Sequence, residues 1–192
     1  MTRLSRDDII AGAGRRFATH GYHGTSMRDL GDDLGILGSS IYAHVGGKQE
    51  LLVAVIEHGA EYFEASATAA LALENARDQL EAFVKGHIDV VLDHRPEART
   101  YLSEVDFLDD DQRKAVADRR DGYEWHLVGI LERCVAEGVI DQRVDVRLAS
   151  IYILSILNTI DRWFSETGRV GRDALGEDVF RFVLRGLGGT SY

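Results

Sequence analysis

Residues 25–52 read TSMRDLGDDLGILGSSIYAHVGGKQELL, and this stretch decides the fold. Met27, Leu30 and Leu34 recur at helical spacing, which predicts a first short helix with one apolar face. Gly35 follows directly, at the position where many helices end in a left-handed residue that glycine adopts at low cost. The pattern therefore predicts a helix-turn-helix that leads into a third helix.

The second helix of this motif is predicted to be very short and polar on its outer side. Ile41 and Val45 lie four residues apart and hold it against the core, while Ile36 and Leu37 enter the core from the turn. Small residues let the backbone approach a DNA major groove, and polar side chains bond to bases or phosphates. The same spacing also fits an ordinary helical hairpin whose turn needs glycine. The outward candidates for DNA contact are Gly38, Ser39, Ser40, Tyr42 and His44.

Further candidates for DNA contact flank the motif. Lys48 opens the third helix, where its charge and the positive end of the helix dipole both favour a phosphate. Arg3 and Arg6 lie in an arm that could reach a phosphate or the minor groove, although a solvated chain end explains them nearly as well. The start of the first motif helix, where a hydroxyl can serve as the N-cap, adds Thr25, Ser26 and Arg28.

The motif resembles the DNA-binding signature of the TetR family of bacterial repressors. The resemblance covers most of residues 5–52. It implies a helix-turn-helix DNA-binding domain over residues 1–50 and an effector-binding and dimerisation domain over residues 51–192. The positions that carry it are Thr25, Gly35, Ile36, Ser39, Ile41, Tyr42, Ala43, His44, Lys48, Leu51 and Leu52.

Three positions depart from the pattern of the family. The family usually has alanine at Gly31, phenylalanine at Val45, and serine, asparagine or aspartate at Gly47. We therefore expect Val45 to anchor the second motif helix less firmly. We also expect the third helix to lack its usual N-cap.

Composition fits a globular protein of the cytoplasm. With 192 residues and 45% hydrophobic residues, the chain can form one large domain or two small ones with a real core. The single cysteine, Cys134, rules out an internal disulfide and fits a reducing compartment. The N-terminus is polar and unlike a signal peptide, and the longest apolar run, residues 151–157, is too short for a bilayer.

The distribution of charge leaves room for DNA binding despite a net charge of −10. Residues 1–52 carry equal numbers of basic and acidic side chains, so the whole excess of negative charge lies in residues 53–192. An acidic remainder repels DNA and restricts docking to the N-terminal face.

Helical patterns fill the rest of the chain, and no strand signal or repeat interrupts them. The predicted fold class is therefore all-α, with an N-terminal three-helix helix-turn-helix domain and a C-terminal six-helix bundle for ligand binding and dimerisation. Outside the motif we expect helices at about 6–20, 48–73, 76–94, 96–107, 109–137, 146–167 and 174–187.

The predicted helix 146–167 is apolar on nearly every side. A helix with two apolar sides is buried on two sides, and in a chain of this size we expect the second side to face another subunit. The resemblance likewise implies a homodimer formed through the last two helices. The candidate interface residues are Ile153, Leu157, Ile160, Phe164, Val179, Phe180, Val183 and Leu187.

Aromatic residues on four predicted helices could converge on a small-molecule pocket. Apolar walls with few polar groups describe such a pocket, and they describe a plain core equally well. The resemblance implies an effector site in this bundle. No matched catalytic set or cofactor motif stands out. No metal site stands out either, because neither cysteine nor a Glu-x-x-His motif accompanies the histidines. The candidates are Phe63, Phe83, His87, Tyr101, Phe107, Tyr123 and Trp125.

A weaker resemblance concerns residues 137–146 and 162–168. The motifs EGVI, DV and RWF resemble the TetR branch that controls fatty-acid and steroid breakdown and responds to acyl-CoA thioesters. Arg162 beside Trp163 would suit a ligand that bears phosphates and stacks. In the alternative interpretation, Trp163 packs at the dimer interface and Arg162 pairs with an acid.

The favoured function is a ligand-responsive homodimeric repressor. We expect it to bind a palindromic operator and to be released by a small hydrophobic effector, with an acyl-CoA favoured and a plain hydrophobic compound as the alternative. An all-helical enzyme and a helical interaction protein without DNA binding are more remote alternatives.

Overall fold

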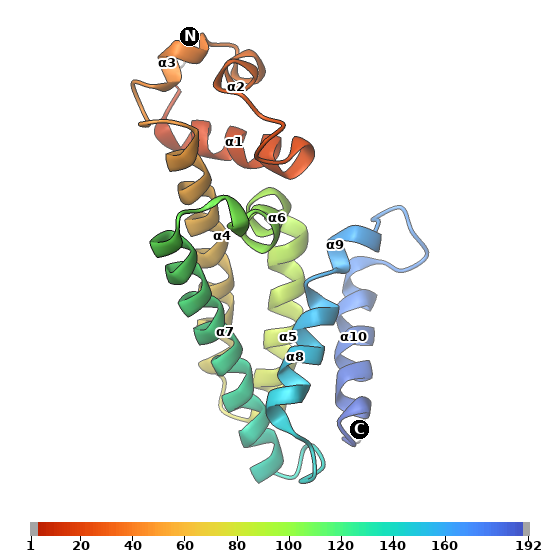
Figure 1. Cartoon of the computed structure of the whole chain (residues 1–192). Coiled ribbons are helices and arrows are strands. Elements are labelled where there is room, and N and C mark those ends of the chain that lie inside the picture. Colours follow the sequence, from red (N-terminus) through yellow and green to blue (C-terminus); the bar gives the residue numbers. More distant parts are fainter. Residues whose placement is uncertain (1–3, 190–192) are drawn as a thin grey trace. The chain divides into compact units, whose positions relative to one another are not determined.

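The computed structural model describes residues 4–189, and every regular element among them is helical (Figure 1). This confirms the predicted all-α class. The elements in chain order are α1 Arg6–His20, α2 Met27–Leu34, α3 Gly38–Ile41, α4 Lys48–Leu71, α5 Ala76–Asp93, α6 Arg95–Ser103, the 3-10 helix η1 Val105–Phe107, α7 Asp110–Ala136, α8 Val146–Leu157, α9 Ile160–Trp163 and α10 Arg172–Gly186.

The chain divides into two compact units. The first comprises the residues up to Tyr62 together with His94–Asp118, and the second comprises Phe63–Asp93 together with the residues from Arg119 onward. Helices α4 and α7 each begin in the first unit and end in the second.

In the first unit, α1 packs against α2 and α6. A capping box begins α1, because the Ser5 hydroxyl accepts from the Asp8 N–H at 3.1 Å and the Asp8 carboxylate accepts from the Ser5 N–H at 2.8 Å. Ile9, Ile10 and Phe17 of α1 are buried. The apolar face predicted for this helix is therefore buried, and α1 supports the helix-turn-helix through its contact with α2.

In the second unit, α5 contacts α8 and α10, and these helices lie side by side in Figure 1. Arg172 at the start of α10 forms ion pairs with Asp89 and Asp93 of α5. Lys85 of α5 pairs in turn with Glu177 of α10. Ion pairs thus supplement the apolar contacts between α5 and α10.

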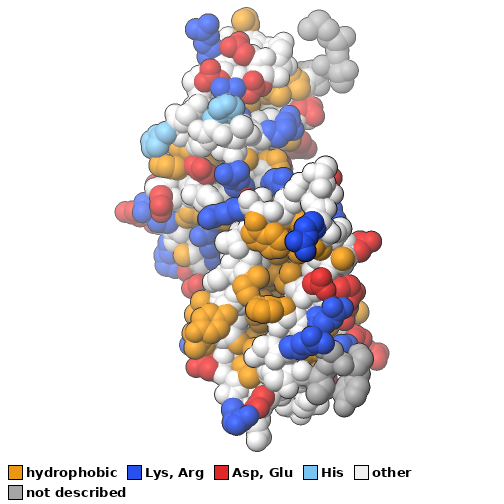
Figure 2. Space-filling view, turned by 90° about the vertical axis from the view of Figure 1, so that its right-hand side faces the viewer, with side chains coloured by type: hydrophobic (Ala, Val, Ile, Leu, Met, Phe, Trp, Pro, Cys, Tyr) orange, Lys and Arg blue, Asp and Glu red, His pale blue; other side chains and the backbone are white. Residues whose placement is uncertain are grey.

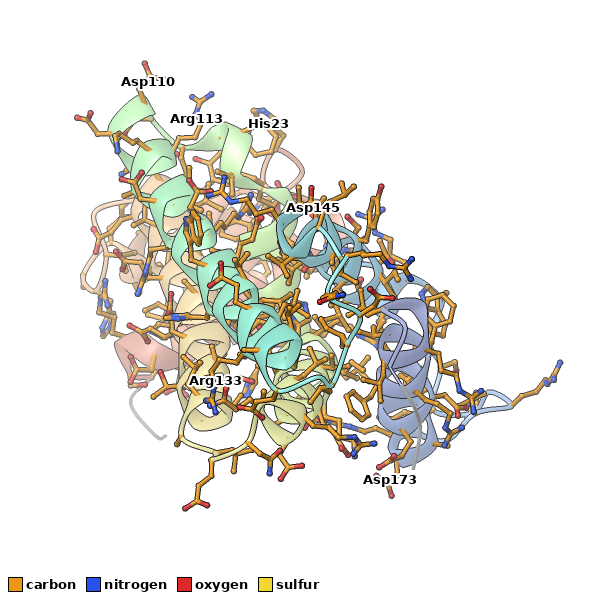
Figure 3. The ribbon with its side chains drawn as sticks, turned by 90° about the horizontal axis from the view of Figure 1, so that it is seen from below. His23, Asp110, Arg113, Arg133, Asp145 and Asp173 are labelled. Atoms are coloured by element: carbon orange, nitrogen blue, oxygen red, sulfur yellow. The ribbon has the colours of Figure 1, made fainter. Side chains whose placement is uncertain are left out.

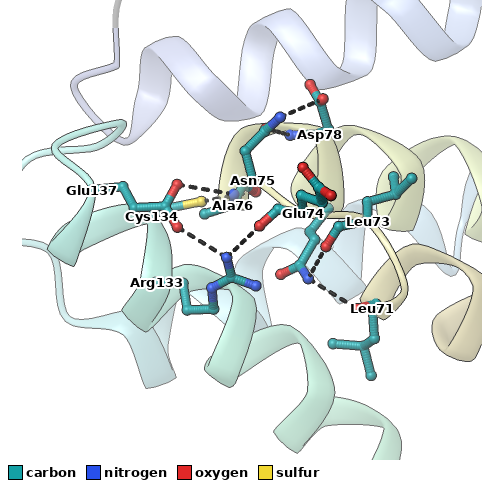
Figure 4. A network of polar contacts seen from close by, with 10 residues as sticks. Leu71, Leu73, Glu74, Asn75, Ala76, Asp78, Arg133, Cys134 and Glu137 are labelled. Atoms are coloured by element: carbon teal, nitrogen blue, oxygen red, sulfur yellow. Dashed lines mark hydrogen bonds and ion pairs between the residues drawn. The ribbon is translucent and has the colours of Figure 1, made fainter.

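A polar network closes the loop between α4 and α5 (Figure 4). The buried Gln79 amide donates to the carbonyls of Leu71 and Leu73 at 3.0 and 2.8 Å. Arg133, which lies near the end of α7 (Figure 3), donates to the Glu74 carbonyl at 2.7 Å. The carboxylate of Glu137 accepts from the Ala76 N–H. The network joins the ends of α4, α5 and α7.

Two predicted helices are interrupted. The region expected to be a single helix over 146–167 forms α8 and the short α9. The break falls at Asn158 and Thr159, and the Thr159 hydroxyl donates to the Ile156 carbonyl at 2.9 Å, a local bond that competes with helix continuation. Likewise, the region 96–107 forms α6 and η1. No helix within residues 4–189 is long and apolar enough to cross a membrane.

Candidate DNA interface and effector site

The first motif helix, α2, is capped by Ser26. Its hydroxyl accepts from the Asp29 N–H at 3.1 Å, and the Asp29 carboxylate accepts from the Ser26 N–H at 3.0 Å. Thr25 is instead buried, and its hydroxyl donates to the Gly21 carbonyl at 3.0 Å. Ser26 is therefore the cap, while Thr25 fixes the loop that precedes α2.

The turn of the motif rests directly on α2. Gly35 adopts the left-handed conformation with φ 67°, as predicted. A Cβ atom added at Gly31 would lie 2.6 Å from the Gly38 nitrogen and 2.7 Å from the Ile36 oxygen. Backbone meets backbone at this point, so the entry of α3 is held at a fixed position relative to α2.

Helix α3 has only four residues, and Ile41 and Val45 anchor it from inside. Of the predicted DNA-contact set, Ser39, Ser40 and Tyr42 are exposed, and Gly38 and His44 are half-buried.

The prediction that Leu37 enters the core is wrong. Its side chain is 74% exposed, whereas Ile36 is half-buried. On either side of the turn backbone lies against backbone, since a Cβ added at Gly31 or Gly38 would lie 2.6 or 2.8 Å from a backbone atom.

Two of the basic candidates near the motif already have partners. The Lys48 ammonium lies 4.1 Å from the centre of the Tyr22 ring, and burial lowers the pKa of this lysine. Arg6 pairs with Glu50 at 3.2 Å. Arg28 is exposed, and Arg3 lies outside the described residues.

Gly47 precedes α4 and has no side chain to accept from the first N–H groups of the helix, as the prediction of a missing usual N-cap stated. The Glu50 carboxylate accepts from the Gly46 N–H at 2.6 Å. A residue of the first turn thus reaches back to the preceding loop and fixes it against the start of α4, but it does not accept from the N–H groups of the helix itself.

Four of the predicted effector-site residues converge in the second unit, and all of them are buried. The ring of Phe63 lies 4.8 Å from that of His87 and 5.5 Å from that of Tyr123. The Phe83 ring lies 4.9 Å from that of Tyr123. These residues come from α4, α5 and α7. We refer to Phe63, Phe83, His87 and Tyr123 as the aromatic cluster.

His87 is the polar member at the centre of the aromatic cluster. Its Nδ1 atom lies 3.0 Å from the Tyr123 hydroxyl. Its Nε2 atom is buried and has no hydrogen-bond partner of good geometry among residues 4–189. Burial lowers the pKa of His87 to about 3, and the nearby Asn158 side chain opposes this shift only in part. The imidazole is therefore neutral near pH 7, and its Nε2 atom makes no hydrogen bond of good geometry within residues 4–189.

The other predicted effector residues lie elsewhere. Tyr101 and Phe107 belong to the first unit, where the Phe107 ring stacks on Tyr22 at 5.4 Å. Trp125 is 53% exposed, with the Arg147 guanidinium 4.2 Å from its ring centre. Arg162 is exposed and forms no ion pair within the described part of the chain, so the pairing with an acid considered for it is not observed there.

The predicted dimer residues are largely inside one chain. Ile153, Leu157, Ile160, Phe164, Phe180 and Val183 are buried, and Val179 and Leu187 are half-buried. The large apolar side chains that remain exposed on this part of the second unit are different ones. They are Leu148, Ile151, Tyr152, Trp163 and Phe182.

A groove of about 310 Å³ separates α8 from α10, and its walls include Leu148, Tyr152 and Phe182. Figure 2 shows apolar side chains gathered on this face. We call this surface the α8–α10 face. Sequence reasoning identified the helices but missed these residues, because helical periodicity does not show which side of an all-apolar helix faces its own core.

No metal site accompanies these features. Among residues 4–189, no three His, Cys, Asp or Glu side chains lie close enough together to hold a metal ion.

Comparison with known families agrees with this geometry. Residues 9–55 match the model for "Bacterial regulatory proteins, tetR family", and residues 73–187 match the model for "Tetracyclin repressor-like, C-terminal domain". The protein is therefore a DNA-binding transcriptional regulator with a helix-turn-helix, and not an enzyme. The chain belongs to the TetR family.

Several relatives share most of their length with this chain. The HTH-type transcriptional repressor KstR2 of Mycolicibacterium smegmatis is 27% identical, over 95% of this chain and 90% of the relative. The solved TetR family regulator PfmR of Thermus thermophilus has a TM-score of 0.84 and 31% identity, covering 93% of this chain and 98% of its own. AibR, solved in complex with isovaleryl coenzyme A and operator DNA, has a TM-score of 0.85 and 23% identity, covering 92% and 96%.

The expected branch of the family is also supported. KstR2 is described, for Mycobacterium tuberculosis, as a ketosteroid transcriptional regulator. The resemblance drawn from residues 137–146 and 162–168 pointed to regulators of fatty-acid and steroid breakdown.

Proposed function

We propose that this protein is a homodimeric repressor that binds a palindromic operator in the cytoplasm and releases it when a hydrophobic effector binds the second unit. The observation that carries this proposal is the α2–turn–α3 geometry in a TetR-family chain. The turn is fixed by backbone contact between Gly31 and Gly38, and it presents the exposed side chains of Ser39, Ser40 and Tyr42.

At the operator, the proposed contacts divide by chemistry. Hydroxyl groups of Ser39 and Ser40 reach base edges, and those contacts specify sequence. Tyr42 and Lys48 hold phosphates, which positions the protein without selecting bases. Lys48 as a residue is half-buried, with its ammonium 4.1 Å from the centre of the Tyr22 ring, and in this proposal the ammonium donates to a phosphate from that position.

Operator binding should respond differently to the two groups of substitutions. Tyr42→Ala or Lys48→Ala should weaken binding about tenfold on every sequence, and Lys48→Ala should lower the slope of log affinity against log salt by about one for each half-site. Ser39→Ala or Ser40→Ala should instead change the preferred sequence. Fluorescence anisotropy with DNA from the protein's own upstream region and with random duplexes measures both effects.

Lys114→Ala is the matched control for Lys48→Ala. Lys114 is an exposed lysine of α7 that pairs with Asp118 at 2.6 Å and lies outside the motif. If the four motif variants bind the operator as the wild-type chain does, then α3 is not the recognition helix.

For dimerisation, the proposed surface is the α8–α10 face. Exposed apolar patches of this kind on a soluble chain mark interaction sites. A two-fold pair would present two copies of α3, which explains why the operator should be palindromic with half-sites spaced by about 34–36 Å or a multiple of it.

For the effector, the proposed site is the aromatic cluster. An apolar ligand would pack among Phe63, Phe83 and Tyr123, and the unpartnered Nε2 atom of His87 would give it one polar contact. Phe63 lies on α4, the same helix that begins beside the motif at Lys48. A ligand that prefers one orientation of α4 would therefore shift the population of DNA-binding states.

The favoured effector class is an acyl-CoA. The relative AibR was solved with isovaleryl coenzyme A, and Arg162 of this chain is an exposed cation without an ion pair among residues 4–189. Such a cation suits the phosphates of coenzyme A. The alternative is a plain hydrophobic compound that needs only the aromatic cluster.

Calorimetry separates these two effector classes. We expect an acyl-CoA to bind at least about tenfold more tightly than its free acid, because Arg162 adds a charged contact to phosphate. Arg162→Ala should remove most of this advantage, whereas Arg119→Ala, which removes an exposed cation on α7, should not. Operator DNA must weaken effector binding by the same factor by which the effector weakens operator binding. Equal affinity for acyl-CoA and free acid in both variants would favour the plain hydrophobic compound.

A further inference from the structure

Leu37 is the most exposed large hydrophobic side chain among the described residues, with 74% of its surface accessible. It occupies the N-cap position of α3 and makes no side-chain hydrogen bond to the helix. It is followed directly by Gly38, Ser39 and Ser40, which belong to the proposed DNA surface.

Leucine at this position gives up two sources of stability in the free protein. At the N-caps of α1, α2 and α8, the side chains of Ser5, Ser26 and Asp145 accept backbone hydrogen bonds, and Leu37 cannot. A side chain that is mostly exposed also gains little from burial. A contact made only in the bound state would compensate for both losses.

The position of Leu37 is fixed by the backbone on either side of it. The Ile36 N–H donates to the Gly31 carbonyl at 2.9 Å. On the other side, a Cβ atom added at Gly38 would lie 2.8 Å from the Met27 oxygen, so Gly38 also lies against α2. Leu37 is therefore presented from a rigid turn and not from a mobile loop, which a specific contact requires.

The chemistry of the major groove limits what Leu37 can contact there. Base edges present nitrogen and oxygen donors and acceptors, and the one apolar group among them is the C5-methyl of thymine. A leucine side chain neither donates nor accepts a hydrogen bond. We infer that Leu37 packs against a thymine methyl in each half-site of the operator and so determines part of the sequence preference.

This inference rests on the proposed operator binding through α3, and it extends that proposal to a residue outside the polar contact set. The contact is made by the apolar surface of the Leu37 side chain. If this exposed leucine contacted another protein, or nothing at all, the removal of thymine methyl groups would not change the affinity for DNA.

The test is a cycle that combines protein and DNA changes. The purified full-length chain first selects its own operator from a library of random duplexes. Each thymine of one half-site is then replaced singly by deoxyuridine, which removes only the methyl group. For the wild-type chain we expect one such replacement to lower affinity about fourfold, the value of burying one methyl group.

Leu37→Ala should bind the thymine operator more weakly and should no longer distinguish thymine from deoxyuridine at that position. Leu37→Ser offers a second variant that can restore an N-cap hydroxyl and so protects the test against misfolding. It should lose the same discrimination. Leu73→Ala is the control, because Leu73 is an exposed leucine in the loop between α4 and α5.

Three results would overturn the inference, and they show whether the proposed operator binding fails as well. If the wild-type chain selects an operator but no thymine replacement affects it, or if Leu37→Ala keeps the same discrimination, only the role of Leu37 fails. If the wild-type chain selects no sequence at all, the proposed operator binding fails, and the role of Leu37 fails with it.

Discussion

Phe182→Arg is expected to convert the proposed dimer into monomers and to lower operator affinity at least about a hundredfold, because binding of the second half-site is no longer linked to binding of the first. Phe182 is 66% exposed on α10, and Tyr152 is 59% exposed on α8 across the same groove. In a two-fold dimer, each copy would bring the new guanidinium against an apolar wall, and burying an unpaired charge is costly. Analytical ultracentrifugation and anisotropy with the operator measure the two effects.

Phe182→Leu is the matched control, since it keeps an apolar side chain at the same position and should remain dimeric. Ile153 and Leu157 are unsuitable for this experiment because both are buried within one chain, where arginine would unfold the protein. A wild-type chain that is monomeric at micromolar concentration would contradict the dimer. So would a dimeric Phe182→Arg variant with normal operator affinity.

Gly31→Ala is expected to destabilise the first unit, although alanine is the better helix former and is usual at this position in the TetR pattern. The gain in helix propensity is about 1 kcal/mol. The added Cβ would lie 2.6 Å from the Gly38 nitrogen, a backbone atom that cannot rotate away. Overpacking of this kind costs about 1–3 kcal/mol and shifts the backbone. We therefore expect a lower free energy of unfolding and weaker operator binding.

Gly129→Ala in α7 provides a control of opposite sign. A Cβ added at Gly129 meets no atom within 4 Å, so alanine should stabilise α7 by about 1 kcal/mol. Chemical denaturation of both variants, followed by circular dichroism, compares them directly. Equal stabilisation by the two substitutions would show that the turn relaxes without cost and that Gly31 does not set the position of α3.

The features predicted well from sequence are those encoded by neighbouring residues. A hydroxyl cap of α2 at Thr25 or Ser26 and a left-handed Gly35 depend on a few adjacent positions; the structure has the cap at Ser26, and Gly35 is left-handed as expected. Ile41 and Val45 anchor α3 from positions four apart, as helical spacing indicated. The three-helix motif is therefore predictable from the sequence alone.

The features that sequence did not predict depend on contacts between elements. Leu37 was expected in the core, but it is exposed beside the contact between Gly31 and Gly38, which are seven residues apart. Tyr123 and Trp125 were grouped as pocket residues, yet residues two apart on a helix point about 200° apart. Only Tyr123 reaches the aromatic cluster, while Trp125 is exposed.

The same limit applies to the helices of the α8–α10 face. An all-apolar pattern in α8 predicts two buried sides but cannot assign them. The structure places Ile153 and Leu157 inside the chain and leaves Ile151 and Tyr152 on the surface. That division depends on how α8 packs against α5, and the sequence of α8 alone does not determine this packing.

The buried imidazole of His87, at the centre of the aromatic cluster, makes the stability of the second unit depend on pH. The pKa of His87 is lowered by burial to about 3, below its ordinary value of 6.5. Between these values the unfolded chain binds a proton that the folded chain excludes, so the contribution of neutral His87 to stability is fully present above pH 6.5 and is lost as the pH falls toward 3. Acidification thus acts on the same core that we propose as the effector site. Protonation of His87 there favours unfolding, whereas an effector would occupy the folded core.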